Sequence, residues 1–329
     1  MPAKKIDEID AKILKDLLID GRKAFTEIAR EAQVSKDAIW QHYNKMKKEG
    51  IIIGATIQLN YIALGYNVYA SIFVDVPVSQ QQQVMEQIRK MPGLFGAYRW
   101  GSPSRLWAPV SDLMKAEQIE PVKQLIRKIP SILKLEVEIW TGIKNIPENL
   151  SVLINDKTRN EKEKIEIPTK DRSKKKPYKV DKIDRQLIEK LVLNSRASFS
   201  EIGKELGIST STAIRRYNHL KRNGIIRALI QINPIKIGYP IEACFRLTTD
   251  SQQGLNRVAD KIAEIPDVRG IFKTAGAHDL TILTETRNFE HLIALETEIA
   301  NVQGVREMEA PVLNQMPILP YPREHISTF

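Results

Sequence analysis

The chain carries the same sequence pattern twice, and this repeat constrains the fold more than any other feature. Residues 5–52 align without a gap on residues 179–226. Identical residues occupy matched positions along the whole alignment, including Asp10 and Asp184, Leu17 and Leu191, Phe25 and Phe199, Ile28 and Ile202, and Tyr43 and Tyr217. A repeat of this length is too long for a solenoid unit and is typical of a duplicated pair of domains. A chain of 329 residues is also long enough for two or more hydrophobic cores.

Each copy begins with three short helical patterns. In the second copy, apolar residues recur at helical spacing over residues 183–191 and again over 199–206. A turn then leads to Ser209 (Ser35 in the first copy), whose hydroxyl is placed to cap a third helix. That helix ends at Gly224 (Gly50), the residue type best suited to a left-handed C-terminal cap. Helix, helix, turn and helix is the pattern of a helix-turn-helix DNA-binding unit.

After each helical unit the apolar period changes from that of a helix to that of a strand. In the first copy Ala70, Ile72 and Val74 alternate with Tyr69 and Phe73. The patterns that follow run β-α-β-β-α-β in both copies, which is the ferredoxin-like plan. Helices cover one face of such a sheet, so the apolar residues Tyr69, Phe73 and Trp140 on the other face predict that a second sheet packs there.

The predicted fold class is therefore α+β, with two copies of a winged-type helix-turn-helix domain, each followed by a ferredoxin-like βαββαβ sensing and dimerisation domain. The predicted helix-turn-helix domains are residues 1–54 and 179–227, and the predicted sheet domains are residues 55–145 and 228–329. Residues 146–178 form a charged linker, in which Lys174–Lys176 either touch phosphates or belong to a solvated tether. We expect the sheet domains to pair within one chain as a pseudo-dimer, with homo-oligomers in addition, although the linker also permits exchange between chains.

The charge distribution favours an anionic partner for the second helix-turn-helix copy. The net charge is +10, and residues 181–227 hold ten basic and five acidic side chains, whereas residues 228–329 hold nine and thirteen. The sequence has no apolar run of about 20 residues and no signal-peptide core, so it predicts a cytoplasmic protein without a membrane partner. The single cysteine, Cys244, excludes an internal disulfide framework and a thiolate metal cluster, and it reads as a small buried strand residue.

The third helix of the second copy is the strongest candidate DNA contact. Ala213, Tyr217 and Leu220 recur at spacings that face the core. The candidate DNA-binding residues of this copy are Ser209, Thr210, Ser211, Thr212, Arg215, Arg216 and His219. Short hydroxyls at a helix N-terminus can meet phosphates or base edges, and arginine can fork onto guanine. A solvated helix face with a serine cap would look similar, but the preceding helix, the turn and the duplication favour DNA.

The third helix of the first copy carries different outward-facing residues. Its candidate DNA-binding residues are Lys36, Gln41, His42 and Lys45. Gln41 can pair with adenine and the lysines with phosphate, whereas Asp37 would oppose a phosphate backbone unless it accepts from cytosine. Trp40 belongs to the core or forms a surface wedge, and we expect the core. This copy reads a different half-site or binds DNA without sequence preference.

The sequence resembles the Lrp/AsnC family of bacterial and archaeal transcription regulators. The resemblance rests on four stretches of the second copy: "DKIDRQLIEKLVLNSRASFSEIGKELGIS", "STSTAIRRYNHLKRNGII", "INPIKIGY" and "KTAGAHDLTIL". It implies double-stranded DNA as a partner and a small effector such as an amino acid. Gly276 and Asp279 match the family's sensing loop, where Asp279 would accept a hydrogen bond from an amino group, although the same residues also suit a tight β-turn. The first copy has Arg105 near the place of the acid, so effector sensing is expected to be one-sided.

The sequence contains no pattern that supports catalysis. It lacks a phosphate-cradling glycine loop, an HExxH motif and a serine elbow, and His278 and His291 lack metal-ligand spacing. We therefore expect no catalytic residue, no cofactor and no metal. Sirohaem decarboxylases resemble the same fold, but the basic third helix and the lack of a histidine and arginine cluster in the sheet domains count against that enzyme. A metabolite-binding protein without DNA binding is the third alternative.

Overall fold

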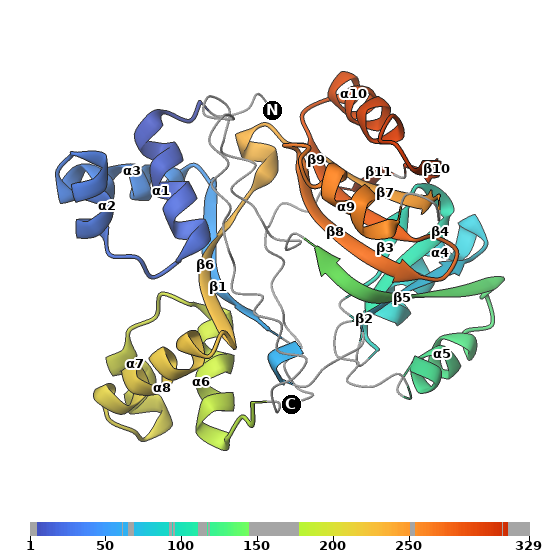
Figure 1. The fold of residues 1–329 in the computed structure, drawn as a ribbon. Helices are drawn as coiled ribbons and strands as arrows, with labels where there is room; N and C mark the ends of the chain where they lie inside the picture. The colour runs from blue at the N-terminus through green and yellow to red at the C-terminus, as the bar shows by residue number, and fades with distance from the viewer. Residues whose placement is uncertain are drawn as a thin grey trace.

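A computed structural model describes residues 5–60, 62–64, 69–91, 94, 96–110, 117, 119–144, 178–250, 254–310 and 312–314. Figure 1 shows two helical units beside a long two-stranded ribbon, with the large sheet on the other side. Of the predicted linker 146–178, only Tyr178 lies within the described residues, so Lys174–Lys176 lie outside them. Within these ranges, every helix is too short or too polar to span a bilayer.

The two helical units have the predicted order and the predicted caps. The helices are α1 (Glu8–Ile19), α2 (Phe25–Ala32) and α3 (Lys36–Lys48) in the first copy, and α6 (Lys182–Leu193), α7 (Phe199–Leu206) and α8 (Thr210–Arg222) in the second. The Ser35 and Ser209 hydroxyls each accept a backbone N–H at 3.1 Å at the start of α3 and α8. Gly50 and Gly224 follow these helices with φ of 70° and 63°, which confirms the left-handed ends.

The strands that leave the helical units pair with each other rather than with the large sheet. These strands are β1 (Ile52–Leu59) and β6 (Ile226–Ile232), and they form an antiparallel ladder from Ala55–Ile230 to Leu59–Ile226. The domain boundaries predicted after residues 54 and 227 therefore fall inside these two strands. Short 3-10 turns follow each strand, at Ile62–Leu64 and Pro234–Ile237.

Each helical unit completes its hydrophobic core with residues of the other copy. The core of the first unit, around Ile13, Leu17 and Ile28, includes Ile230 and Ile232 of β6. In return, the core of the second unit includes three residues of the first copy, namely Ile57, Leu59 and Ala63. Since a buried aliphatic side chain contributes roughly 1.5–3 kcal/mol, this exchange couples the folding of the two units. The copies therefore form one body within the chain.

The large sheet has nine strands and contains two ferredoxin-like modules. The first module consists of β2 (Tyr69–Asp75), α4 (Gln81–Arg89), β3 (Tyr98–Trp100), β4 (Ser102–Val110), α5 (Ile119–Arg127) and β5 (Lys134–Lys144), with a 3-10 turn at Val78–Gln80. The second consists of β7 (Ile241–Thr249), α9 (Leu255–Ile262), β8 (Val268–Ala275), β9 (Leu280–Thr286), α10 (Phe289–Ala300), β10 (Val305–Glu309) and β11 (Val312–Asn314). The strand orders β5-β2-β4-β3 and β10-β7-β9-β8 are equivalent, and β5 pairs with β8 to join the modules. The predicted βαββαβ plan is thus confirmed in both copies.

An aromatic cluster fills the sheet face that the helices leave uncovered. Residues of the first copy, Phe73 and Trp100, pack there against Cys244, Phe272 and Leu283 of the second. Trp140 also contacts this cluster, and its ring centroid lies 3.9 Å from that of Phe272. Phe73 and Trp140 are thus covered by residues of the other module, but the two modules belong to one nine-stranded sheet rather than to two separate sheets. Cys244 is fully buried on β7, as expected.

Candidate DNA-binding surface and sheet-domain cavity

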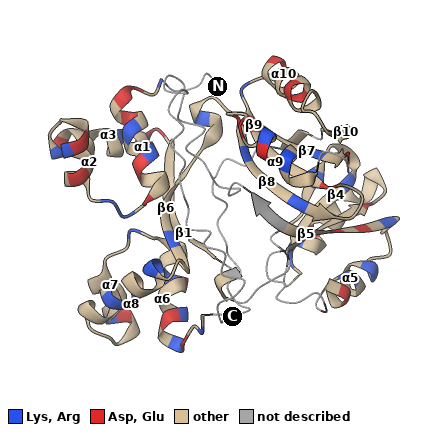
Figure 2. Cartoon of the chain, viewed as in Figure 1, with Lys and Arg blue, Asp and Glu red and all other residues tan. Residues whose placement is uncertain are grey.

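Helix α8 presents a polar face to solvent and an apolar face to its own unit. Ala213, Tyr217 and Leu220 are buried, as the spacing predicts. The exposed residues at its start and along its outer flank are Ser209, Thr210, Ser211, Arg215 and His219, with Thr212 partly exposed. The Ser209 hydroxyl accepts from the Thr212 backbone N–H at 3.1 Å, which caps the helix, and it lies 2.9 Å from the hydroxyls of Ser211 and Thr212. Basic and acidic residues are interspersed over both helical units (Figure 2).

The two adjacent arginines of α8 have different surroundings. Arg215 is exposed and makes no hydrogen bond or ion pair with the described part of the chain. Arg216 donates from Nη1 to Asp181 Oδ2 at 2.6 Å and to Asp184 Oδ1 at 2.8 Å. Hydrogen bonds to these two carboxylates raise the pKa of Arg216. The side chain of Asp184 is only 6% exposed, so Arg216 neutralises a buried acid and fastens α8 to the start of α6.

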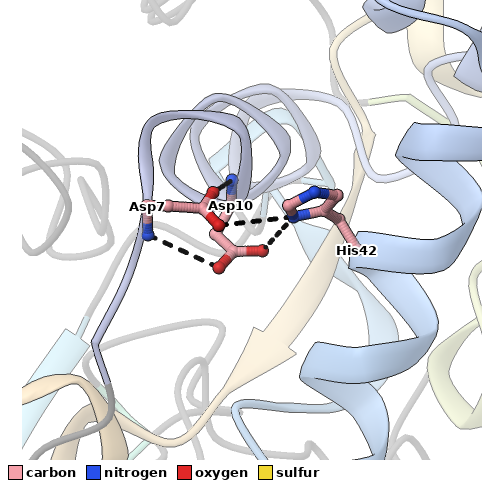
Figure 3. A group of neighbouring side chains, drawn as sticks. All are labelled: Asp7, Asp10 and His42. Carbon is pink, nitrogen blue, oxygen red and sulfur yellow. Dashed lines mark hydrogen bonds and ion pairs between the residues drawn. The ribbon is translucent and has the colours of Figure 1, made fainter.

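The first copy makes the matched contact with a histidine. His42 Nδ1 lies 2.8 Å from Asp10 Oδ1 and 3.7 Å from Asp7 Oδ2 (Figure 3). Lys45 Nζ lies 3.3 Å from Asp10 Oδ2, and this hydrogen bond raises the pKa of Lys45. Asp7, Asp10 and His42 bring three potential metal ligands together. The Lys45 ammonium already faces both carboxylates, so the group is an ion-pair cluster that docks α3 on α1.

The outer face of α3 carries Lys36 and Gln41, both exposed, together with an exposed apolar residue. Trp40 is 52% exposed, so the expectation that it belongs to the core is wrong. Ile39 and Tyr43 supply the buried positions, and residue 40 lies about 100° around the helix from residue 39. The matched residue of α8, Ile214, is 39% exposed. Both third helices therefore place an apolar side chain beside polar candidates for DNA contact.

The acids that hold these helices are buried residues that the helical spacing does not single out. Asp10 and Asp184 are 1% and 4% exposed. They occupy matched positions among apolar residues of α1 and α6. An identical acid at a core-facing position of both copies is the feature of the sequence that indicates a buried ion pair. Two identical arginines, Arg22 and Arg196, also occupy matched positions of the two copies.

A cavity of about 590 Å³ lies where the two sheet modules meet. Its walls come from both copies: Trp100, Arg105, Lys134, Glu136, Arg246, Ala277, His278, Glu309 and Ala310. Arg246 is 1% exposed and donates to Glu136 at 2.9 Å and to Glu138 at 2.8 Å. Although burial acts to raise it, the pKa of Glu138 is lowered by the His278 imidazole, whose Nδ1 lies 3.7 Å from Oε2, and by the Arg246 guanidinium, which donates to it. The cavity is therefore lined by charges of both signs.

The loop predicted to sense an effector borders this cavity, but through its middle residues. Ala277 and His278 line the cavity. Asp279 Oδ2 instead accepts from the Thr249 backbone N–H at 2.7 Å and from its hydroxyl at 3.1 Å. Gly276 lies against β5 of the other copy, where a Cβ would meet Glu138 atoms at 3.4 Å. A direct ligand role for Gly276 and Asp279 stays a prediction.

The cavity also corrects one expectation about the sheet domains. Arg105, Arg246 and His278 gather around it, so the expectation that these domains contain no histidine and arginine cluster is wrong. Arg246 and His278 meet within the second module, where β7 pairs with β9, and the pairing of the modules brings Arg105 of the first copy to them. Arg105 pairs with Asp75 at 3.0 Å and Glu136 at 2.6 Å rather than with the sensing loop. Glu136, Glu138 and His278 could be grouped as metal ligands, but Arg246 already binds both carboxylates.

Comparisons with known proteins agree with this architecture. The AsnC-type helix-turn-helix domain matches residues 6–47 and 180–221, and the Lrp/AsnC ligand-binding domain matches residues 242–315. These matches define a helix-turn-helix protein with a ligand-binding domain. An HTH-type transcriptional regulator of Pyrococcus abyssi is 31% identical over 139 residues, covering 42% of this chain and 87% of that protein. The regulator LrpA of Pyrococcus horikoshii is 31% identical over 131 residues, covering 39% of this chain and 92% of that protein. The chain belongs to the Lrp/AsnC family of transcriptional regulators.

Two solved structures of one protein match almost the whole chain. The sirohaem decarboxylase NirDL superposes with a TM-score of 0.63 over 94% of this chain and 91% of that chain, at 15% identity. At this identity the likeness shows a shared fold. It includes both helical units and both sheet modules, because the match spans nearly all residues.

Proposed function

We propose that this protein is a sequence-specific regulator that binds duplex DNA with two unequal recognition helices held in one chain. The observation that carries the proposal is α8, a capped helix in a family-matched helix-turn-helix unit. Its exposed flank combines hydroxyls with Arg215, which has no partner among the residues that the structure describes. Hydroxyls and backbone N–H groups at a helix N-terminus suit phosphates, and a free guanidinium suits guanine O6 and N7.

The two recognition helices have separate roles in this proposal. Helix α8 reads bases through Thr210, Ser211 and Arg215. Helix α3 reads a different half-site through Gln41 and holds the backbone through Lys36. Arg216 and His42 act indirectly, since their ion pairs with Asp184 and Asp10 orient the helices.

A salt titration of DNA binding tests the proposal. Selection from a random duplex library with the full chain should return one motif with two different halves. Fluorescence anisotropy on that duplex should show affinity falling steeply as salt rises, because phosphate contacts release counterions. Arg215→Ala should weaken the selected sequence more than a scrambled one, whereas Arg99→Ala, an exposed arginine of β3, should change neither. Absence of binding at low salt would contradict the proposal.

The cavity is the proposed effector site, and its chemistry fits a zwitterionic amino acid. Arg105 and Lys134 offer cations for a carboxylate, and Glu309 offers an anion for an ammonium group. Trp100 adds an apolar wall for a side chain. This cavity lies between unequal loops of the two copies, which supports one-sided sensing.

Calorimetry with a panel of amino acids tests the site and its stoichiometry. We expect at most one molecule bound per chain, and loss of binding in Arg105→Gln. Asp279→Asn keeps the oxygen that accepts from Thr249, so binding should persist. Loss of binding in Asp279→Asn alone would instead make Asp279 a direct ligand, as the sequence predicts.

The second candidate function is an enzyme of the sirohaem decarboxylase type. It is favoured by the cluster of Arg105, Arg246 and His278 and by the fold of NirDL, one structure of which is a complex with an iron-uroporphyrin III analogue. Helix α8 and the family matches favour the regulator, which we propose is not an enzyme. A shift in the absorbance of an iron porphyrin on addition of protein would favour the enzyme. An unchanged spectrum alongside specific DNA binding would favour the regulator.

A further inference from the structure

Arg22 and Arg196 occupy matched positions of the two copies, and each reaches into the other copy. Arg22 donates from Nη1 to the carbonyl oxygens of Ser195 and Ala197, the latter at 3.0 Å. Arg196 donates from Nη1 to the carbonyl oxygen of Gly21. The contacts are reciprocal, because each arginine holds the turn between the first and second helices of the opposite unit.

Both guanidinium groups also lie over aromatic rings of the opposite unit. The distances from guanidinium carbon to ring centroid are 3.9 Å for Arg22 to Phe199, 5.4 Å for Arg22 to Tyr217, 4.7 Å for Arg196 to Phe25, and 5.7 Å for Arg196 to Tyr43. Tyr43 and Tyr217 are buried residues of α3 and α8. Each arginine therefore links its own copy to a buried tyrosine inside the other copy's recognition helix.

The turns themselves dock on the ribbon with the same reciprocity. The Gly21 N–H donates to the Ala228 carbonyl of β6 at 2.7 Å, and the Ser195 N–H donates to the Ala55 carbonyl of β1 at 3.1 Å. A Cβ at Gly21 would lie 2.5 Å from the Leu229 backbone, so the turn lies directly against the strand.

The arginines are held at an electrostatic cost. Burial lowers the pKa of both guanidinium groups. Their partners are carbonyl oxygens and the faces of aromatic rings. The planar guanidinium of arginine has several N–H donors and can contact both kinds of partner at once, whereas the ammonium group of lysine cannot.

We propose that Arg22 and Arg196 are positioning residues that fix the distance and orientation between α3 and α8, so that one chain engages two DNA half-sites at a single separation. The consequence for DNA rests on the proposed function, whereas the rigid spacing of the helices is a property of the free protein. The two parts are therefore tested separately.

A distance measurement on the free protein tests the spacing. Spin labels are placed by Lys48→Cys and Arg222→Cys, which are matched exposed positions at the ends of α3 and α8. The chain's one native cysteine, Cys244, is buried, so labelling is selective. The protein that carries only these two cysteine substitutions is the background protein, and its distribution of distances between the labels should be narrow. The distribution should be broad when Arg22→Lys and Arg196→Lys are added. Arg99→Lys is the control and should leave it narrow.

A series of DNA duplexes tests the consequence for recognition. Two selected half-sites are separated in one-base-pair steps, and a duplex with one half-site is included. The background protein should prefer one separation, and the double lysine variant should lose at least about tenfold affinity there while its single-half-site affinity stays unchanged. The separation profile should flatten.

Three results would overturn the inference. The first is an interlabel distribution that stays narrow in the double lysine variant. The second is an equal loss of affinity on every duplex, including the single half-site, which indicates general destabilisation. The third is a background protein that binds all separations equally. If the background protein binds no DNA, the proposed function fails, and the distance measurement alone decides the positioning role.

Discussion

Arg215 and Arg216 are neighbours on α8, and replacing each with alanine in turn distinguishes an arginine that contacts DNA from one that stabilises the fold. Both residues are on α8, and sequence pattern treats them alike. In the structure, Arg216 neutralises Asp181 and Asp184, whereas Arg215 has no partner in the described part of the chain. Arg216→Ala should therefore act on stability, and Arg215→Ala should act on DNA binding.

The magnitude follows from the burial of the partners. Removing one member of a fully buried ion pair costs about 3–5 kcal/mol. Here the side chains of Asp181 and Arg216 are 53% and 25% exposed, and the Tyr178 hydroxyl still donates to Asp184 at 3.2 Å. The cost should fall to about 1–2 kcal/mol, which corresponds to a decrease in Tm of about 2–5 °C. Arg215→Ala should stay within about 0.5 kcal/mol of the parent.

Urea unfolding followed by circular dichroism measures the first effect, and anisotropy on the selected duplex measures the second. Losing one bidentate guanine contact costs about 1–3 kcal/mol, or roughly 5- to 150-fold in affinity for the selected sequence. Under conditions where it is folded, the Arg216→Ala variant should bind the selected duplex with an affinity closer to that of the parent than the Arg215→Ala variant does. The reasoning is refuted if Arg216→Ala keeps the parent unfolding midpoint and loses as much specific affinity as Arg215→Ala.

Two further predictions concern stability. Gly21→Ala should lower the free energy of unfolding in urea by about 1–3 kcal/mol, since its Cβ would lie 2.5 Å from the Leu229 backbone, and an unchanged value would show that the turn does not dock on β6. Hydrogen bonds from Lys12 and Lys23 lower the pKa of Glu31 from 4.5 to about 2, so its contribution is complete above pH 4.5 and is lost as the pH falls towards 2. The stability difference between the parent and Glu31→Gln should shrink over that interval, and a difference independent of pH would contradict the ion-pair cluster.

The local elements were predictable because they depend on neighbouring residues. Helical geometry alone predicts the cap at Ser209 and the left-handed end at Gly224. It also predicts the buried stripe of Ala213, Tyr217 and Leu220. The βαββαβ order followed from the change in apolar period. Trp40 was misplaced because one residue of rotation separates a core position from an exposed one, and the aromatic character of tryptophan suggested burial.

The candidate sites were only partly predictable because charged side chains choose partners across elements. Arg216 and His42 have the spacing of outward residues, yet carboxylates on another helix capture them. Asp279 looks available in a loop, yet Thr249 of the neighbouring strand occupies one of its oxygens. The cavity joins Arg105 to Arg246 and His278 across two copies, and no spacing within either copy encodes that meeting.

The sequence by itself determined that this protein is a duplicated pair of helix-turn-helix and ferredoxin-like units, because repeat register, apolar period and caps are local properties written in order along the chain. Only the tertiary structure decided that the copies share their cores through β1 and β6, that β5 joins β8, and that Arg22 and Arg196 exchange partners. The physical reason is that edge strands and buried charges are satisfied by whichever groups the fold brings near. Strand pairing and desolvation therefore fix those partners, and neither depends on residues that are neighbours in the sequence.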